Sequence, residues 1–424
     1  MTTVTPERKE IMPEVYLTCC EDHKFKTGLL SAQIITPLRR DTASACALLP
    51  SVLQRGTVRY PDMEQIGAAL DEMYGAGLKV MVRKRGEALC VGFGIDFVDD
   101  ILLGRQEKLL ERCALFLGEL FLQPVTRGGR FLSEYVASEK ENLIHAIAGL
   151  RNDKREWADL RLIREMCADE PYGVDRWGDE ESVRKLNQRT LYEEYRRLLC
   201  NSRMELFYSG SAAARTVEDA LRDAFAPMPR GTVLPLPPLV RRSAPEEPRH
   251  ITETMDVEQS RLAAGFRCGS LDAPAMMIAS LLFGGSGNSK LFRNVREEKS
   301  LCYYISSAFV RSKNIMTLCA GIDSDAKDRV LDAAVGEWAA ICRGEIEDWE
   351  LTAAKKGAVS YLRSLGDSQG ATENYYIGQA ATGLSEQPEE LAQSLLEVTG
   401  ERVMAAAATV KLDTVYFLQG GDPQ

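Results

Sequence analysis

The chain has 424 residues and a mass of 47.0 kDa, which is enough for about two to three domains. Its 45% hydrophobic and 27% charged residues are typical of a folded globular protein and exclude a disordered or fibrous chain. The formal net charge of −10 repels polyanions, and no basic patch indicates a nucleic-acid partner. The histidines His23, His145 and His250 lie more than 100 residues apart, so no helix can carry a paired-histidine zinc motif such as HxxEH.

The cysteines indicate a reducing compartment. There are eleven, an odd number, with no CxxC pair, and some lie in apolar runs, as Cys90 and Cys319 do. This distribution is typical of buried thiols rather than of a disulfide framework. The first twenty residues contain no apolar signal-peptide stretch, and no segment is apolar enough for a membrane span. We therefore expect a cytoplasmic protein.

The early elements of the chain indicate a sheet covered by helices. Pro61 and Asp62 begin a predicted helix that Gly75 and Gly77 end, and a predicted β-hairpin follows with its turn at residues 85–87. Long helical patterns then dominate residues 99–199 and 324–410. Strands grouped early in each half, with helices after them, predict an α+β fold.

A proline-rich segment at residues 231–250 prevents both helix and central strand and divides the chain. We expect a first unit over residues 1–230 and a second over 251–424. The two units share landmarks in the same order, which indicates a duplication. The shared landmarks are an extended segment (28–38 and 261–270), a Gly-Ile-Asp tripeptide (94–96 and 321–323) and a final strand ending in glycine (204–210 and 414–420).

The glycine-rich stretch at residues 281–309 is not a nucleotide-binding loop. Its glycines are misplaced for both GxxxxGK[ST] and GxGxxG. The structural alternative is a loop joining two helices, with Asn288 or Ser289 capping the second helix.

The same stretch, LLFGGSGNSKLFRNVREEKSLCYYISSAF, resembles the insulinase-type, or pitrilysin-like, metallopeptidases, which are inverted zincins. The resemblance extends to GEIEDWELTAAKKGAVSYL at 344–362 and EPYGVDRWGDEESV at 170–183, and so covers most of the chain. It implies two related α/β units joined by a linker. The segments NDKREWADLRL and REEKSLCYYISS also resemble the bacterial branch associated with modification of elongation factor P.

In this family the zinc motif HxxEH lies on the first helix of the first unit. The resemblance places it on Ala47-Leu48-Leu49-Pro50-Ser51, where Ala47 and Ser51 replace the histidines and Pro50 replaces the general base. A hydrolytic zinc needs about three protein ligands, so we expect no bound metal or other cofactor. Glu139 and Glu141 lie near the position of the family's later glutamate ligand. The simpler interpretation of both is solvated helix charge.

Active family members also use an arginine and a tyrosine of the second unit, seven residues apart, near the scissile carbonyl. Arg296 and Tyr303 match this pair in type and spacing. A guanidinium and a phenol can each donate a hydrogen bond to a peptide carbonyl or a developing oxyanion at neutral pH. Two structural alternatives remain. Arg296 could form an ion pair with Glu297 or Glu298, and the alternation of Tyr303 with apolar neighbours could bury it in a sheet core.

The resemblance therefore predicts a chain that is not an active peptidase on its own. In the heterodimeric branch of the family one subunit supplies zinc and the other supplies the arginine and tyrosine. We expect this chain to be the second kind, with an HxxEH-bearing subunit as its partner and a peptide as its substrate. The alternatives are a homodimeric structural or peptide-binding scaffold of the same fold, and an independent hydrolase with a nonstandard site.

Overall fold

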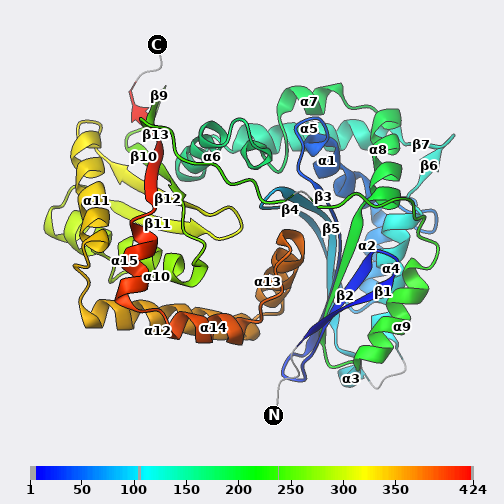
Figure 1. Ribbon diagram of the computed structural model, residues 1–424. Coiled ribbons are helices and arrows are strands. Elements are labelled where there is room, and N and C mark those ends of the chain that lie inside the picture. Colours follow the sequence, from blue (N-terminus) through cyan, green and yellow to red (C-terminus); the bar gives the residue numbers. More distant parts are fainter. Residues whose placement is uncertain (1–5, 104–106, 237, 422–424) are drawn as a thin grey trace. The chain divides into compact units, whose positions relative to one another are not determined.

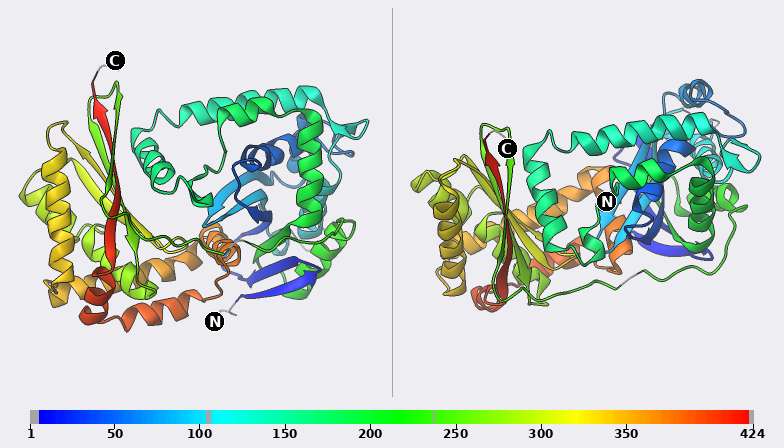
Figure 2. Two further views of the ribbon diagram at one scale, coloured as in Figure 1. Left: turned by 45° about the horizontal axis from the view of Figure 1, so that its top comes forward. Right: turned by 90° about the horizontal axis from the view of Figure 1, so that it is seen from above.

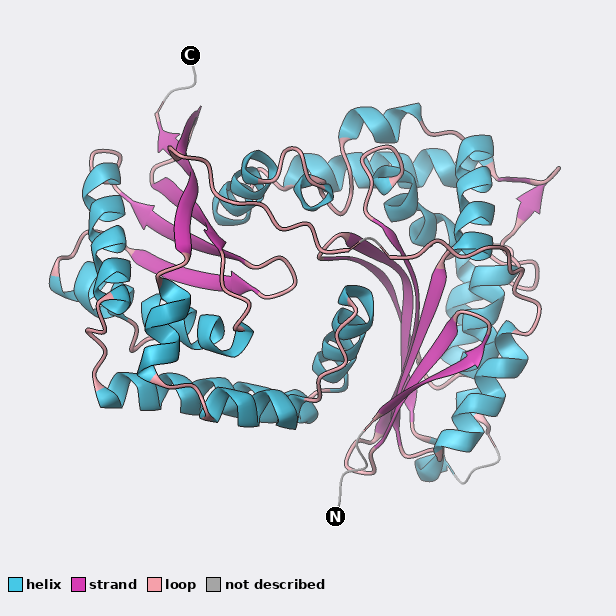
Figure 3. Ribbon diagram, in the orientation of Figure 1, coloured by secondary structure: helices cyan, strands magenta, loops and turns pink. Residues whose placement is uncertain are grey.

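The computed structural model describes residues 6–103, 107–236 and 238–421. The chain forms two compact units, each of which combines a β-sheet with helices (Figures 1 and 3). This is the predicted α+β class. Unit 1 comprises Met1–Ala148, Val174–Pro238 and Gly366–Ser385; unit 2 comprises Gly149–Gly173, Leu239–Leu365 and Glu386–Gln424.

The strands of unit 1 are β1 (Glu7–Met12), β2 (Val15–Glu21), β3 (Thr27–Pro37), β4 (Gly77–Arg85), β5 (Ala88–Val98), β6 (Thr126–Arg127), β7 (Arg130–Phe131) and β8 (Arg203–Gly210). Its helices are α1 (Ala43–Leu53), α2 (Met63–Glu72), α3 (Asp100–Leu103), α4 (Leu109–Leu122), α5 (Ser133–Gly149), α7 (Glu180–Lys185), α8 (Gln188–Asn201), α9 (Ala214–Phe225) and α13 (Gln369–Thr382). The short helix η3 (Leu365–Asp367) lies at the unit boundary. The predicted helix after Asp62 is α2, and the predicted hairpin is β4–β5.

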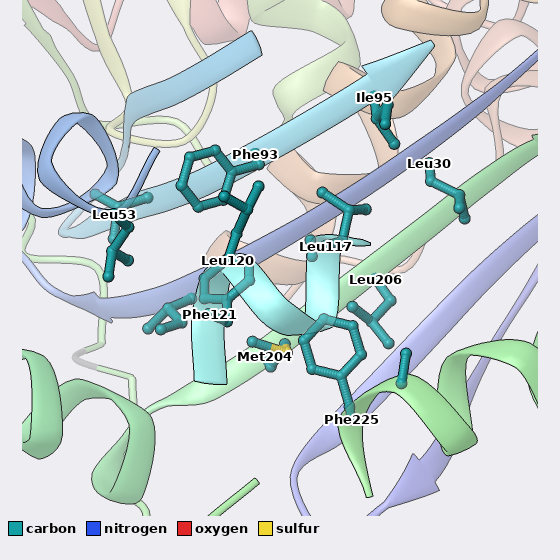
Figure 4. Packing of buried hydrophobic residues seen from close by; sticks show 14 of the residues in the cluster. Leu30, Leu53, Phe93, Ile95, Leu117, Leu120, Phe121, Met204, Leu206 and Phe225 are labelled. Carbon is teal, nitrogen blue, oxygen red and sulfur yellow. The ribbon is translucent and has the colours of Figure 1, made fainter. Parts of the chain in front are cut away.

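The main core of unit 1 lies between one face of its six-stranded sheet and helices α1, α4, α8 and α9. Figure 4 shows Phe93 of β5, Phe121 of α4 and Phe225 of α9 in this core. The ring centroid of Phe121 lies 5.3 Å from that of Phe93 and 6.0 Å from that of Phe225. Each of these rings is essentially buried, so their removal from water contributes strongly to the stability of this unit.

The other face of this sheet is covered by α13, which lies beside the strands in each view (Figures 1 and 2). Strand β3 alternates between the faces: Leu30 packs in the main core, whereas Leu29 and Ile35 pack with Ile377 of α13. Both faces of β3 are therefore buried, which explains why apolar residues occur on both sides of this strand.

Unit 2 contains strands β9 (Arg249–Met255), β10 (Ser260–Cys268), β11 (Tyr304–Val310), β12 (Ile315–Ile322) and β13 (Val410–Gly420). Its helices are α6 (Lys154–Met166), η1 (Pro171–Gly173), α10 (Ala273–Phe283), η2 (Leu291–Glu298), α11 (Lys327–Cys342), α12 (Asp348–Ser364), α14 (Pro388–Leu396) and α15 (Gly400–Ala407). Phe266 of β10 packs edge-on against Phe283 of α10, whereas α6 covers the opposite face. Gly265 permits this close approach, because a Cβ there would lie 2.5 Å from Sδ of Met166.

The two sheets repeat one topology. In unit 1 the order is β4-β5-β3-β8-β2, followed by β1, and in unit 2 it is β11-β12-β10-β13-β9. The pairs β2/β8 and β9/β13 are both parallel, and the other neighbours in these two series are antiparallel. The same order with the same strand directions supports the duplication inferred from sequence.

In two segments the spatial units differ from a simple division of the chain at residues 231–250. Residues 149–173 belong to unit 2, because α6 packs on β10 and β13. Residues 366–385 belong to unit 1, because α13 packs on β3 and β8. Each sequence half therefore supplies a helix to the sheet of the other half.

A network of buried charges fixes the segment around α6 in unit 2. Arg267 donates to Glu170 at 2.6 Å and to Asp413 at 3.0 Å, and Lys313 lies 2.5 Å from Glu170. Burial raises the pKa of Glu170, but hydrogen bonds from Arg267 and Lys313 outweigh it and hold this pKa below its ordinary value. Ionised Glu170 therefore stabilises this part of unit 2.

The cysteines form no disulfide: all eleven are described, all are free, and seven are buried. This agrees with the expectation of unpaired thiols. In the described ranges, none of the helices is both long and apolar enough to cross a membrane.

Candidate functional site

The positions expected to carry the zinc motif lie on α1 in unit 1. Ala47 and Ser51 line a cavity of about 390 Å³, together with side chains of β4, α5 and the loop before α7. Pro50 lies within α1 and is buried. A methyl group and a hydroxyl thus stand where the resemblance places two imidazoles, and the cavity remains.

Glu139 of α5 lines the same cavity but is not a solvated helix charge. Only 8% of the residue is exposed; Arg55 lies 3.2 Å from Oε1, and Asn142 donates to Oε2 at 3.1 Å. The simpler interpretation offered for Glu139 is therefore wrong, because Arg55 allows the carboxylate to be buried as an ion pair. It holds for Glu141, which is exposed.

This donor set does not fit a zinc ion. Its carboxylate is already paired, and Ala47 provides no ligand. Within the part of the chain that the structure describes, no group of three or more His, Cys, Asp or Glu side chains could hold a metal.

The loop before α7 closes one side of the cavity with Arg176 and Trp177. The Ser44 hydroxyl donates to the Trp177 carbonyl at 3.2 Å and accepts from the Asp179 amide at 3.2 Å. Gly178 has a φ of +69°, and a Cβ there would lie 2.0 Å from Oγ of Ser44, so this turn requires glycine. Residues 170–183 contributed to the family resemblance, but sequence reasoning gave no role to Arg176 or Trp177.

The second pair of predicted residues lies in unit 2, beginning with Arg296 on η2. This element is a π-helix rather than an α-helix: the amide of Lys299 donates to the Asn294 carbonyl at 3.2 Å, an i to i−5 bond. Its N-terminus has no side-chain cap, so the expected cap from Asn288 or Ser289 is wrong. Ser289 instead donates to the Ser286 carbonyl at 2.6 Å.

Buried contacts hold this π-helix on unit 2. Leu291 and Val295 are fully buried, and the buried carboxylate of Glu350 on α12 pairs with both Lys290 and Arg293. A short helix with unusual hydrogen bonding is thereby fixed by two apolar anchors and a shared carboxylate.

The structure brings Arg296 and Tyr303 together. Arg296 Nε donates to the Tyr303 carbonyl at 3.0 Å, and its guanidinium lies 4.6 Å from the Phe292 ring centroid. Among the described residues Arg296 forms no ion pair with Glu297 or Glu298. The ion-pair alternative is therefore wrong; the arginine instead fixes the backbone before β11.

Tyr303 is 57% exposed, so the alternative of a core tyrosine is also wrong. The alternation rule fails here because β11 begins at Tyr304, one residue later. The Tyr303 hydroxyl donates to Oδ1 of Asp323 at 2.9 Å, and this hydrogen bond raises the pKa of Tyr303 above its ordinary value. Tyr304 is distinct: it is half-buried, and its hydroxyl lies 3.7 Å from Sγ of Cys319.

Asp323 is the contact of this pair that sequence reasoning missed. It was recognised only as a landmark of the duplication, the last residue of the second Gly-Ile-Asp tripeptide. The equivalent Asp96 in unit 1 pairs with Lys79 of β4 at 2.5 Å. The recurrence of the tripeptide marks the position in the sequence but does not identify its partner.

Comparisons with known proteins agree with this architecture. Residues 185–358 match the family described as the peptidase M16 inactive domain. The chain is 30% identical over 403 residues to YmfF of Bacillus subtilis, a probable inactive metalloprotease, covering 94% of both chains.

Two solved structures share the fold. The first is a conserved protein from Enterococcus faecalis, at 24% identity and a TM-score of 0.88, covering 99% of this chain and 100% of the other. The second is a peptidase M16 inactive domain from Pseudomonas fluorescens, at 14% identity and a TM-score of 0.79, with the same coverage. On the strength of the match to YmfF over nearly its whole length, the chain belongs to the M16 family of insulinase-type peptidases, and it lacks that family's HxxEH motif.

Proposed function

We propose that this chain is the zinc-free subunit of a two-subunit insulinase-type peptidase. In this proposal an HxxEH-bearing partner supplies the metal and its general base, while this chain presents Arg296 and Tyr303 to the peptide. The observation that carries the proposal is the state of this pair: the two residues are joined by a hydrogen bond, anchored by the π-helix, and Tyr303 is largely exposed. A purely structural pair would be expected to lie in the core, whereas Tyr303 is 57% exposed.

The loss of the metal site in unit 1 supports the same division of labour. Neither Arg296 nor Tyr303 can generate hydroxide, which requires a metal or a general base. Any hydrolysis would therefore depend on the partner. The eleven free thiols support a reducing compartment, and we propose a cytoplasmic location for the complex.

The test is to isolate the untagged natural partner with this chain and measure zinc and peptide cleavage in the complex and in the chain alone. We expect zinc and cleavage in the complex only. Arg296→Ala and Tyr303→Phe should each lower cleavage without dissociating the complex. Matched controls are Arg329→Ala and Tyr361→Phe, which change exposed residues of the same unit and should leave cleavage unchanged.

A scaffold or peptide-binding protein of the same fold is the second candidate. It is favoured by the cavity beside α1, which persists although its carboxylate is neutralised. A stable homodimer, no HxxEH-type reading frame beside this one and no zinc in purified complexes would favour this candidate. Stoichiometric zinc and cleavage by the isolated chain would instead identify an independent hydrolase.

A further inference from the structure

The hydroxyl of Tyr303 is already committed as a donor. Asp323 accepts this hydrogen bond at 2.9 Å, and an ionised carboxylate has no proton to return, so the proton shared by the two groups is that of the tyrosine. The free lone pair of Oη is then available only to accept a hydrogen bond. Tyr303 thus presents an acceptor, not a donor.

Arg296 has the opposite polarity. Its Nε is used by the Tyr303 carbonyl, and its guanidinium lies against the Phe292 ring. In the described ranges Nη1 and Nη2 of Arg296 have no protein acceptor. These two nitrogens can only donate.

We propose that Asp323 is a positioning residue that fixes Tyr303 as a hydrogen-bond acceptor, so that Arg296 and Tyr303 bind a peptide backbone through its carbonyl and its amide N–H respectively. This inference rests on the proposed function, because it assigns the ligand chemistry of the same pair. An extended peptide exposes both a carbonyl and an N–H, so one donor and one acceptor on two residues joined through the Tyr303 backbone can match it, whereas two donors would leave the N–H unpaired.

In each of the two related units, the aspartate at this position contacts a side chain on a neighbouring segment. In unit 1 Asp96 pairs with Lys79, and in unit 2 Asp323 accepts from Tyr303. The position is repeated, but only in unit 2 does its partner have a lone pair left for a ligand. A lysine ammonium has none.

The expectation drawn from sequence, that Tyr303 donates to a carbonyl or an oxyanion, gives the opposite result when Asp323 is removed. If Tyr303 acts as a donor, Asp323→Leu frees its proton and strengthens binding. If Tyr303 acts as an acceptor, the same change releases the ring and weakens binding.

The binding experiment uses a fluorescein-labelled tryptic digest of β-casein as the probe. Its affinity for the complex with the natural partner is measured by fluorescence anisotropy. Tyr303→Phe and Asp323→Leu should each weaken binding about 3- to 10-fold, the range expected for one hydrogen bond. The variant that combines Tyr303→Phe with Asp323→Leu should bind the probe no more weakly than the single variant of lower affinity. Asp323→Asn retains an acceptor oxygen and should restore most of the affinity, and Asp325→Leu is the matched control.

A second readout does not depend on peptide. In the full chain labelled with [¹³Cζ]tyrosine, Asp323→Leu should lower the pKa of Tyr303 toward its ordinary value, whereas Asp325→Leu should not. A Tyr303 resonance that titrates identically with and without Asp323 would overturn the inference, even if Asp323→Leu also reduces folding stability. Equal or tighter binding by Asp323→Leu, with weaker binding by Tyr303→Phe, would overturn it while leaving the proposed function intact. No effect of either Arg296→Ala or Tyr303→Phe would overturn both.

Discussion

One buried carboxylate anchors helix α13 to the sheet of unit 1, and replacing this carboxylate tests how much the anchor stabilises the unit. Glu373 of α13 is fully buried. It accepts hydrogen bonds from Ser31 at 3.0 Å and Gln33 at 2.6 Å on β3, and Arg83 on β4 lies 2.6 Å away. The substitution Glu373→Ala leaves all three donors without their acceptor.

The magnitude follows from these contacts. Removing one partner of a buried ion pair costs about 3–5 kcal/mol. The side chain of Arg83 is 25% exposed and can regain some water, so we expect the lower end, about 3 kcal/mol. The cost should appear in unit 1, because Ser31, Gln33 and Arg83, the described residues that contact Glu373, lie there.

Hydrogen exchange measured by mass spectrometry in increasing urea can report each unit separately, which a single global transition cannot. Peptides from β3 and α13 should lose about 3 kcal/mol of protection in Glu373→Ala. The control Glu141→Ala, an exposed helix residue of the same unit, should change protection by less than about 0.5 kcal/mol. Adding Arg83→Met to Glu373→Ala should recover part of the loss, because it removes the uncompensated charge. Equal loss in both units, or no difference from the control, would refute the reasoning.

Three further predictions test other parts of the molecule. The substitutions Ala47→His, Pro50→Glu and Ser51→His, together with Arg55→Met to release Glu139 as a third ligand, should create zinc binding, measured by equilibrium dialysis against the single histidine variants; failure would contradict the placement of the motif. Burial raises the pKa of Cys302 to about 11, so alkylation by iodoacetamide at this residue should be slow at pH 7 and increase as the pH approaches 11; fast labelling at pH 7 would contradict its burial. The folded-state pKa of Glu170 lies below its ordinary 4.5, so its ionised form contributes its full stabilisation of unit 2 above about pH 4.5. This contribution is lost as the pH falls from about 4.5 through the lower folded-state pKa, so Glu170→Gln should flatten the acid dependence of unfolding.

Local patterns were sufficient for helix α2, for the β4–β5 hairpin and for the repetition of the two halves. The helix predicted to begin at Pro61 and Asp62 is α2, which Asp62 caps, and the ordered landmarks of the two halves correspond to sheets with one strand order. Both depend on residues close together in sequence. The helix that covers the second face of the unit 1 sheet could not be predicted from such local residues. Glu373 of this helix contacts β3 across more than 330 residues, and nothing in the sequence of its own helix distinguishes it from a solvated glutamate.

The candidate site shows the same limit at shorter range. The family spacing indicated Arg296 and Tyr303, and the structure places them in contact. Strand alternation alone would have buried Tyr303, because the start of a strand is uncertain by a residue or two. The role of Asp323 as an acceptor could not be predicted, since it depends on which side chain β12 brings beside the residue before β11.

Two arginines of the π-helix, three residues apart, show why we assign a ligand to only one of them. Arg293 pairs with the buried carboxylate of Glu350 and lies over the Trp349 ring, so its charge is satisfied within the protein. Arg296 lies on the same rigid element, but it meets a carbonyl and a phenyl ring rather than a carboxylate. Neither of these neutralises a guanidinium. Arg296 is thus a half-buried cation to which the described residues offer no carboxylate, which agrees with our proposal of a peptide ligand whose carbonyl would accept from Arg296 and whose N–H would donate to Tyr303.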